Sequence, residues 1–333
     1  MRKTVRMSDI AEKMGISKVT VSNALAGRTG VSPELRRQIH KMALEMGYLA
    51  KTATESSAYS IAVMVSNKYV ARGESFYWEI YWELAALLKI KRAAVVFEMI
   101  SIEEEEQMQM PLSLENGKCD AVIVIGKLKS AYLKEVQNKF GLKIVLLDYY
   151  NRELQADAVI SDGYFGMYKM TNYLLDKGHR KIAFVGSVKA TPSIMDRYHG
   201  YSRALMERGI PIREDWIVED RDLKTGVIVI GKLPRELPTA FACNCDLTAN
   251  ELLKILVESG YHVPEDFSII GFDNYAKNNY YPIGITSYEV NIKAMVKASV
   301  ETVLEKLVSK ENMDTVIKIV SGRIVEKESV MDH

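Results

Sequence analysis

A short stretch near the N-terminus concentrates side chains suited to binding a polyanion. The sequence SKVTVSN, residues 17–23, carries an ammonium, three hydroxyls and a carboxamide, at Ser17, Lys18, Thr20, Ser22 and Asn23, with Val19 among them. Ammonium and hydroxyl groups bond phosphate oxygens, and a carboxamide can form two bonds with the edge of an adenine. The stretch therefore predicts contact with a nucleic acid.

The charge of the chain is divided in a way that agrees with this prediction. Residues 1–50 contain nine Lys and Arg and four Asp and Glu, a net charge of +5. The remaining residues contain 35 Lys and Arg and 39 Asp and Glu, a net charge of −4. A basic head on a mildly acidic body indicates a polyanionic partner for the head alone.

Three short helices are expected to position these side chains. Gly15 can adopt a positive φ and so end the first helix, and the Ser17 hydroxyl can cap the second. Ser32 and Pro33 are typical of the start of a third helix, which Gly47 ends. The apolar stripes are Ile10, Ala11 and Met14; Val21, Ala24 and Leu25; and Leu35, Ile39, Met42, Ala43 and Met46. This pattern predicts a helix-turn-helix unit. The alternative is a helical mini-domain with a polar face.

From residue 60 onward, short β-rich runs alternate with helical stretches. The runs are SIAVMVS, AAVVFEM, AVIVIG, KIVLLD, KIAFVGS, TAFAC and SIIGF. Continuous Val and Ile runs bounded by turns are typical of strands covered on both faces, and hence of parallel sheets. About 270 residues of such alternation are too many for one small open sheet, so the pattern predicts two α/β lobes.

The body lacks complete motifs for catalysis or metal binding. No G-x-G-x-x-G, G-x-S-x-G or H-E-x-x-H occurs, and GVIVIGKL, residues 226–233, has Leu233 where a phosphate loop requires Ser or Thr. Cys243 and Cys245 could share a metal, but no nearby Cys/His pair completes a site, which favours structural thiols. We expect no enzymatic activity, no catalytic residue, no cofactor and no metal site.

The sequence contains no signal for export or membrane insertion. The N-terminus has no apolar core of the kind that a secretory signal requires, and no run of about 18 apolar residues occurs. These features predict a cytoplasmic protein with no membrane partner.

The segment MSDIAEKMGISKVTVSNALAGRTGVSPELRRQIHKMALEMGY resembles the DNA-binding head of the lactose-repressor (LacI/GalR) family of bacterial transcription regulators. The resemblance implies that Lys18, Val19 and Asn23 read bases in the major groove. It also implies that Ser17 and Thr20 contact the DNA backbone.

Residues 49–59, within LAKTATESSAYS, predict a linker that departs from the family. The family has a hinge helix here that forms on operator binding and wedges a leucine into the minor groove. This segment is several residues shorter, and no leucine follows Leu49. We therefore expect less DNA bending and looser control of the head by the body.

The resemblance extends over the body. DGYFGMYKMTNYLLDKGHRKIAFVGS, the Arg-x-x-Gly-Tyr pattern at Arg197, Gly200 and Tyr201, VPEDFSIIGFDN and SGRIVEKESV are all similar to family segments. They imply a two-lobed core like the periplasmic sugar-binding proteins, with parallel sheets and three chain crossings. The implied domains are a head at 1–48 and a core at 60–330. The first lobe is expected at 60–160 and 289–318, and the second at 161–288 and 319–330.

The resemblance also implies an effector site between the lobes. Its expected residues are Phe76, Tyr77, Asp148, Arg197, Cys245, Asp246 and Asp273. A guanidinium fork and carboxylates suit a polar small molecule with neighbouring hydroxyls, such as a sugar. The alternatives are turn or strand-end caps for the acids, an interlobe or surface salt bridge for Arg197, and core or dimer packing for the aromatics. Cys245 stands where the family has Asn or Ser, which removes one expected contact to a sugar.

Together these features predict a sequence-specific repressor that binds a near-palindromic DNA operator as a homodimer and responds to a small-molecule effector. Two alternatives remain at this point. One is a ligand-binding receptor with weak or no operator binding, which the short linker favours. The other is an enzyme, against which the incomplete motifs argue.

Overall fold

The computed structural model describes residues 6–25, 30–46, 59–70, 75–275, 281–309 and 314–333. The chain forms two compact units, Met1–Ser57 and Ala58–His333. We call them the head and the core, and each is described by itself. Residues 49–59, the expected linker, lie outside the described residues apart from Tyr59, which begins the first strand of the core.

The head contains the three expected helices, α1 (Met7–Met14), α2 (Lys18–Leu25) and α3 (Pro33–Glu45). Gly15 ends α1 with a φ of 65°, a conformation that costs glycine little because it has no Cβ. The Ser17 hydroxyl accepts a hydrogen bond from the Thr20 amide at 3.0 Å and thereby caps α2. The apolar stripes meet in one core, in which Ile10, Val21 and Ile39 are fully buried.

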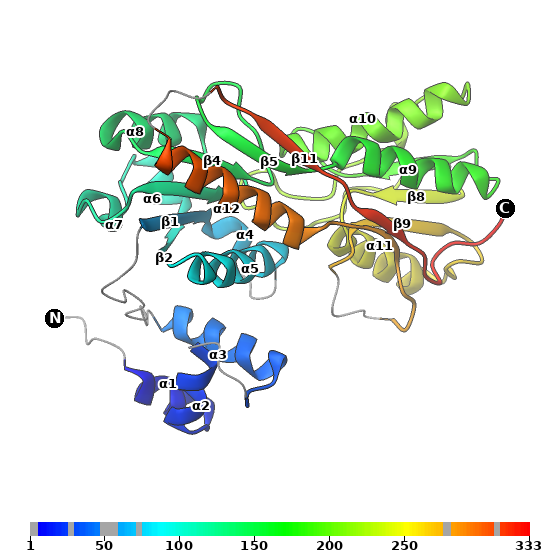
Figure 1. Cartoon of the computed structure of the whole chain (residues 1–333). Coiled ribbons are helices and arrows are strands. Elements are labelled where there is room, and N and C mark those ends of the chain that lie inside the picture. The colour runs from blue at the N-terminus through cyan, green and yellow to red at the C-terminus, as the bar shows by residue number, and fades with distance from the viewer. Residues whose placement is uncertain (1–5, 26–29, 47–58, 71–74, 276–280, 310–313) are drawn as a thin grey trace. The chain divides into compact units, whose positions relative to one another are not determined.

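The described residues of the core form two six-stranded sheets (Figure 1). The first has the order β11-β5-β4-β3-β1-β2 and defines the first lobe. Its strands are β1 (Tyr59–Ser66), β2 (Ala93–Ile100), β3 (Ala121–Ile125), β4 (Lys143–Leu147), β5 (Asp157–Ser161) and β11 (Ile317–Val320). All of its pairings are parallel. The Val and Ile runs lie in β1, β3 and β4, the central strands, where both faces are covered by side chains.

The second sheet has the order β12-β10-β9-β8-β6-β7 and defines the second lobe. Its strands are β6 (Ile182–Val185), β7 (Ile217–Val218), β8 (Ala240–Cys243), β9 (Ser268–Asp273), β10 (Thr286–Glu289) and β12 (Arg323–Val325). Only the edge pair β10–β12 is antiparallel among these pairings. The expected two-lobed α/β core with parallel sheets is therefore confirmed.

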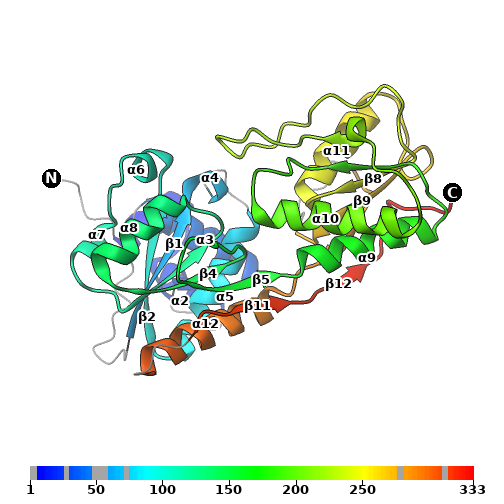
Figure 2. The same cartoon turned by 90° about the horizontal axis from the view of Figure 1, so that it is seen from above.

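Helices cover the sheets of both lobes (Figure 2). The first lobe carries α5 (Phe76–Ile90), α8 (Ser130–Phe140) and α12 (Ile292–Val308), with the short helices α4 (Asn67–Val70), α6 (Ile102–Glu106) and α7 (Leu112–Glu115). The second carries α9 (Gly163–Asp176), α10 (Pro192–Glu207) and α11 (Asp246–Glu258), with the 3-10 turn Glu214–Trp216. Among the described residues, none of the helices combines the length and apolar composition that crossing a bilayer requires.

The chain passes between the lobes at three places, next to residues 162, 290–291 and 321–322. The crossings are bonded together, because the Ser321 hydroxyl donates to Asp162 at 3.2 Å and the Gly322 amide donates to the Tyr288 hydroxyl at 2.8 Å. The expected lobe boundaries after residues 160, 288 and 318 each fall inside a strand, namely β5, β10 and β11. Strand β11 continues past residue 318 because Ile319 pairs with Ile160 of β5.

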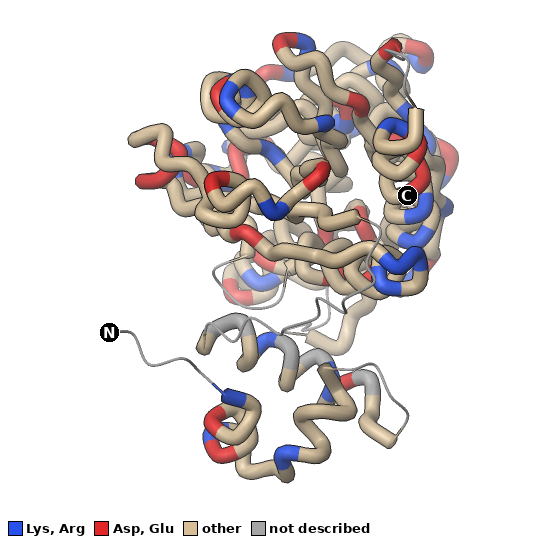
Figure 3. The backbone as a smooth tube through the Cα atoms, turned by 60° about the vertical axis from the view of Figure 1, so that its left-hand side comes forward, with Lys and Arg blue, Asp and Glu red and all other residues tan. Residues whose placement is uncertain are grey.

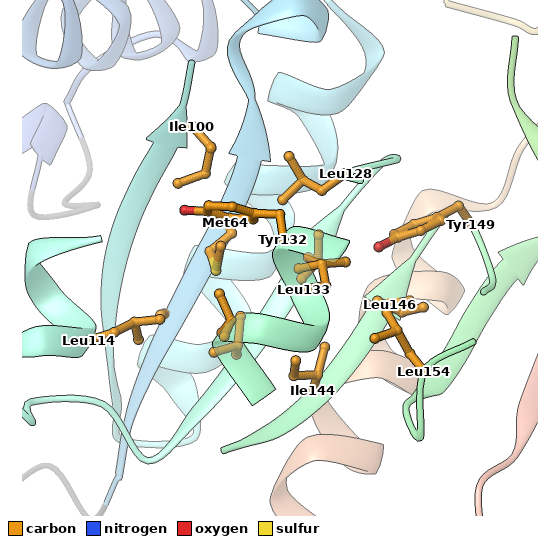
Figure 4. Close-up of a cluster of buried hydrophobic side chains, with 14 of the residues drawn as sticks. Met64, Ile100, Leu114, Leu128, Tyr132, Leu133, Ile144, Leu146, Tyr149 and Leu154 are labelled. Carbon is orange, nitrogen blue, oxygen red and sulfur yellow. The ribbon is translucent and has the colours of Figure 1, made fainter. Parts of the chain in front are cut away.

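Each lobe has its own apolar core. In the first lobe, Tyr132 and Leu133 of α8 pack onto Met64, Leu146 and neighbouring strand residues (Figure 4). In the second, a cluster from β6, β8, β9 and α11 surrounds Phe241. Burial of a side chain of this size contributes about 1.5–3 kcal/mol. The two lobes therefore have separate apolar cores, and the three chain crossings link them covalently.

Candidate functional site

The side chains of α2 divide into a buried and an outward-facing set. Val21 and Ala24 are fully buried, whereas Val19 is 66% exposed and Lys18 is exposed. Ser22 and Asn23 are half-buried. An apolar residue as exposed as Val19 on an otherwise polar helix face fits contact with a thymine methyl group.

Ser17 and Thr20 form a bonded pair at the start of α2. Their hydroxyl oxygens lie 2.8 Å apart, in addition to the bond from the Thr20 amide to the Ser17 hydroxyl. The Ser17 oxygen is thus already an acceptor. One hydroxyl proton of the pair is used between the two oxygens, which leaves the other available to donate to a phosphate.

Basic residues lie on all three head helices (Figure 3), at Lys13 of α1, Lys18 of α2, and Arg36 and Lys41 of α3. Arg36 also stabilises α2 directly, because its guanidinium donates to the Ala24 carbonyl at 3.4 Å near the end of that helix. A cation there bonds a carbonyl of the last helical turn and interacts favourably with the helix dipole. The helix with the predicted DNA-binding residues is therefore capped at both ends by side chains.

In the core, several predicted effector residues meet between the lobes. We call Tyr77, Asp148, Arg197 and Asp273 the interlobe cluster. Asp148 follows β4 with a φ of 66° and accepts hydrogen bonds from the Tyr77 hydroxyl and the Ser161 hydroxyl, each at 3.1 Å. Asp148 is only 4% exposed.

Arg197 of α10 is the cation of the interlobe cluster. It is 6% exposed, donates to the Asn244 carbonyl at 2.7 Å, and has its guanidinium carbon 4.1 Å from the centre of the Phe272 ring. Its Nε is buried without a hydrogen-bond partner among the described residues. A buried guanidinium with an unused donor is suited to bind a polar group that enters between the lobes.

Asp273 ends β9 with a φ of 88°. Its carboxylate accepts from the Tyr275 amide at 3.1 Å and from the amide of Asp246, the first residue of α11. Asp246 itself is 1% exposed and accepts from the Ser287 hydroxyl at 2.6 Å. Asp246 therefore lies behind Asp273 and positions it, whereas Asp273 faces the cluster.

Burial controls the protonation of both cluster carboxyls. It raises the pKa of Asp148, which the Arg197 guanidinium partly lowers again. It raises the pKa of Asp273 well above its usual range, with a further rise from the neighbouring Asp246 charge and an opposing effect of Arg197. Burial and the Asp148 charge also raise the pKa of Tyr77. Arg197 is thus the cation that favours the ionised form of both carboxyls, alongside the hydrogen bonds that each accepts.

Cys245 lies in a polar network on the second-lobe side. Its sulfur is 3.1 Å from the Thr248 hydroxyl and 3.7 Å from a guanidinium nitrogen of Arg221. Arg221 in turn forms two bonds with Asp220, at 2.9 and 2.6 Å. Burial raises the pKa of the Cys245 thiol, so the neutral thiol is favoured. The described residues contain no cluster of His, Cys, Asp and Glu placed to hold a metal ion.

Phe76 joins the two lobes through its ring. It is 9% exposed, and its ring packs edge-on against Tyr275 of the second lobe, with centroids 6.1 Å apart. Trp78 and Trp82 instead stack with centroids 5.9 Å apart, and Phe97 of β2 stacks on Trp78. The aromatic stretch therefore divides between the interlobe cluster and a separate group on α5 and β2.

The side chains of the interlobe cluster are largely buried, with Asp148 at 4% and Arg197 at 6% exposed. A hollow of about 560 Å³ adjoins the cluster at Asp273 and Tyr275. Glu79 and Glu83 of α5 line one side of it, and residues 321–323 line another. Solvent therefore approaches the cluster from this side.

Sequence reasoning missed Tyr69 and Arg221. The Tyr69 ring lies 5.1 Å from that of Tyr77, and its buried hydroxyl has no partner among the described residues. Gly126 makes room for both rings, because a Cβ there would lie 3.2 Å from Tyr77 and 3.3 Å from Tyr69. Tyr69 follows β1, and ligands bind at the carboxyl ends of parallel strands. That rule could have identified Tyr69, whereas Arg221 follows a strand of only two residues, which gave no pattern.

Comparison with known proteins links both regions to one family. Residues 6–50 match the family model "Bacterial regulatory proteins, lacI family", and residues 171–330 match a periplasmic binding protein-like domain. The chain is 25% identical to the ribose operon repressor of Haemophilus influenzae, over 93% of this chain and 95% of that protein. It is 26% identical to the transcriptional repressor PurR of Vibrio parahaemolyticus, over 94% and 95%.

Solved structures share the fold over most or nearly all of this chain. A complex of the transcriptional regulator CelR with cellobiose superposes with a TM-score of 0.69 at 21% identity, covering 98% of this chain and 99% of that one. The lac repressor dimer bound to operator and the anti-inducer ONPF superposes with a TM-score of 0.67 at 19% identity, covering 99% and 100%. A regulator from Enterococcus faecium with bound ribose covers 82% of this chain and 99% of its own, with a TM-score of 0.67 at 21% identity.

Proposed function

We infer that this chain, which belongs to the LacI family of bacterial regulatory proteins, represses transcription by binding a specific DNA sequence, and that a small molecule bound between its lobes changes that affinity. The observation that carries this inference is the combination of a capped, outward-facing α2 in the head with a buried ionic cluster between two lobes of the core. The proposed functional domains are 1–48 for DNA binding, 49–59 as linker and 60–330 for effector binding and dimerisation.

We propose that α2 enters the major groove of DNA. Lys18, Val19 and Asn23 would contact base edges, whereas Ser17, Thr20 and Ser22 would bond the phosphate backbone. Two heads related by a two-fold axis would read a near-palindrome whose half-sites lie about one helical turn apart. The dimeric, operator-bound state of the lac repressor supports a dimer here. Because the target is chromosomal DNA, we place the action of the protein in the cytoplasm.

We propose that the effector is a sugar or a sugar derivative bound at the interlobe cluster. Bound cellobiose and ribose in two structures of the same fold support this class. The chemistry of the cluster supports it as well, because Asp148 and Asp273 can accept from ligand hydroxyls and the Nε of Arg197 can donate. Tyr77 and Phe76 offer ring faces for the apolar side of a sugar.

Ligand binding can control the head only if the two positions of the lobes differ in ligand affinity. In the described conformation, Tyr77 bonds Asp148 within the first lobe and Arg197 bonds Asn244 within the second. A ligand that replaces these partners would bridge Asp148 to Arg197 and Asp273. It would thereby favour one spacing of the lobes and so one placement of the paired heads.

The test is selection of duplex DNA from a random pool by the full chain, followed by binding of the selected sequence across a salt series. We expect a two-fold-symmetric sequence, bound at least about 1,000-fold more tightly than random DNA, with affinity that falls steeply with salt. Recovery of no preferred sequence, with or without sugars present, would refute operator binding and leave a ligand receptor as the function.

A further inference from the structure

The inference concerns the class of effector, and therefore rests on the proposed function. It starts from the loops on the β7 side of the interlobe cluster. Lys68 follows β1, Lys127 follows β3, and Arg221 follows β7. All three lie beyond the carboxyl ends of parallel strands, where α/β proteins bind ligands.

Contacts across the lobes bring these three cations together. The Lys127 ammonium of the first lobe donates to the Ala190 carbonyl of the second at 3.0 Å. The loop that follows β7 reaches α4 (Figure 2), and a Cβ at Gly226 in that loop would lie 3.7 Å from the Lys68 carbonyl oxygen. Val229 in the same loop is 61% exposed, so the loop lies on the surface and is not a buried strand.

The charges around these cations are incompletely balanced. Asp220 neutralises Arg221 through two hydrogen bonds, whereas the Glu105 carboxylate accepts a hydrogen bond from the neutral Lys129 amide and keeps its negative charge. Within the described part of the chain, neither Lys68 nor Lys127 forms an ion pair. Burial lowers the pKa of Lys68. The Glu105 charge raises this pKa, and the positive charges of Lys127, Lys129 and Arg221 lower it again. An anion at this position would relieve that repulsion.

Polar side-chain oxygens without partners lie on the residues next to Lys68 in the chain. The side-chain oxygens of Ser66, Asn67 and Tyr69 are all buried and unbonded among the described residues. The three residues surround Lys68 in sequence, at the end of β1. Buried polar atoms are normally bonded, so a run of such oxygens beside a cation indicates a polar ligand that completes them.

We propose that the effector is an anionic sugar, whose phosphate or carboxylate binds between Lys68, Lys127 and Arg221 while its hydroxyls bind Asp148, Arg197 and Asp273. The two groups of residues are continuous. The Tyr69 ring contacts the Tyr77 ring, and the Tyr77 hydroxyl bonds Asp148. The Lys68 ammonium in turn lies 5.0 Å from the centre of the Tyr69 ring. A chain of contacts therefore runs from Lys68 through Tyr69 and Tyr77 to Asp148. The site therefore has a hydroxyl-binding end and an anion-binding end.

The test compares neutral sugars with their anionic derivatives on the full chain. Ribose, glucose and fructose are titrated beside their phosphate esters, with glucuronate as the carboxylate and inorganic phosphate alone, and dissociation constants are measured at constant ionic strength. We expect at least one anionic sugar to bind 100-fold or more tightly than its neutral parent, since each charged bond contributes roughly tenfold. Preference for a phosphate ester over glucuronate identifies the anion as phosphate, and the reverse identifies it as carboxylate.

Variants separate the anion-binding end from the rest of the site. K68M and K127M should each weaken binding of the anionic sugar roughly tenfold and leave its neutral parent within twofold, and K68R should restore most of the loss. The matched control is K134M on α8, whose ammonium is exposed and pairs with Glu153 at 2.9 Å. The proposal would be overturned if K68M and K127M lost as much affinity for the neutral parent sugar as for the anionic one. It would also be overturned if K134M lost as much affinity for the anionic sugar as they do.

Operator binding in the same samples keeps the two inferences distinguishable. A neutral sugar that binds as tightly as its anionic derivative and changes operator affinity overturns the anionic effector and leaves the proposed function standing. If operator binding is specific but no sugar binds, the effector half of the proposed function fails together with this inference. If an anionic sugar binds but no operator is found, the inference stands and the regulator function fails.

Discussion

Replacement of Arg197 by alanine tests the electrostatics of the interlobe cluster most directly. The change removes a charged hydrogen bond to the Asn244 carbonyl, on the order of 1.5–3 kcal/mol, and a cation–π contact with Phe272 of roughly 0.5–2 kcal/mol. It also leaves Asp148 and Asp273 buried without their cation. We expect the free energy of unfolding to fall by about 3–5 kcal/mol near neutral pH.

The free energy of unfolding that R197A loses should depend on pH in a defined direction. The folded-state pKa values of Asp148 and Asp273 are raised, so both carboxyls hold protons at pH values where the unfolded chain has released them. Stability contributed by such groups is present at low pH and falls as the pH rises above the unfolded value of about 4. Without Arg197 the folded pKa values rise further and the decline continues to higher pH. The penalty of R197A is therefore larger at pH 8 than at pH 5.

The assay is urea and thermal unfolding of the full chain at both pH values, combined with titration of the sugars described above. R197A should also lose its response to every effector. The matched control is R203A, on the same helix but half-buried near the surface and paired with Glu207, and it should change stability far less at either pH. The reasoning is refuted if R197A loses no more than R203A, or if its penalty is the same at pH 5 and pH 8.

Three further substitutions test the head and the packing of the second lobe. N23A should lose about 1–3 kcal/mol of discrimination at one base pair of each half-site, measured by repeating the DNA selection. S17A should remove the cap of α2 and destabilise that helix by about 1 kcal/mol, measured by amide hydrogen exchange of the full chain. G200A should destabilise the second lobe by about 1–3 kcal/mol in urea unfolding, because a Cβ at Gly200 would collide with the Tyr164 carbonyl of α9.

Each of these predictions has a control that isolates its cause. T20V should weaken binding to all DNA sequences alike. An unchanged base preference in N23A would refute the proposed role of Asn23 in reading a base. S17D should keep α2 capped but repel phosphate, so normal exchange with weak DNA binding is expected. H199A alters the exposed neighbour of Gly200 and should be nearly neutral. Equal stability of G200A and H199A would show that α9 and α10 can separate at no cost.

The helices of the head could be predicted from the sequence because their ends are local events. Gly15 ends α1 through its own φ, and Ser17 caps α2 through an amide three residues away. Most central strands could also be predicted, since strands covered on both faces appear as continuous Val and Ile runs. Strands β5, β7, β10 and β11 were not recognised. At least β7 and β11 lie at sheet edges, and none has a long apolar run.

The assignment of residues to the interlobe site depended on tertiary structure. The resemblance identified Asp148, Arg197 and Asp273, which the fold brings together from β4, α10 and β9. Sequence alone could not show that Asp246 lies behind Asp273, or that Arg221 belongs beside them, because those placements depend on which loops meet when two sheets face each other. Local hydrogen bonds and periodicity fix the helices and strands within a few residues. Burial, charge pairing and the protonation of the carboxyls arise from residues that are distant in the chain, such as Tyr77 and Asp148 at 71 positions apart, and only the packed structure decides them.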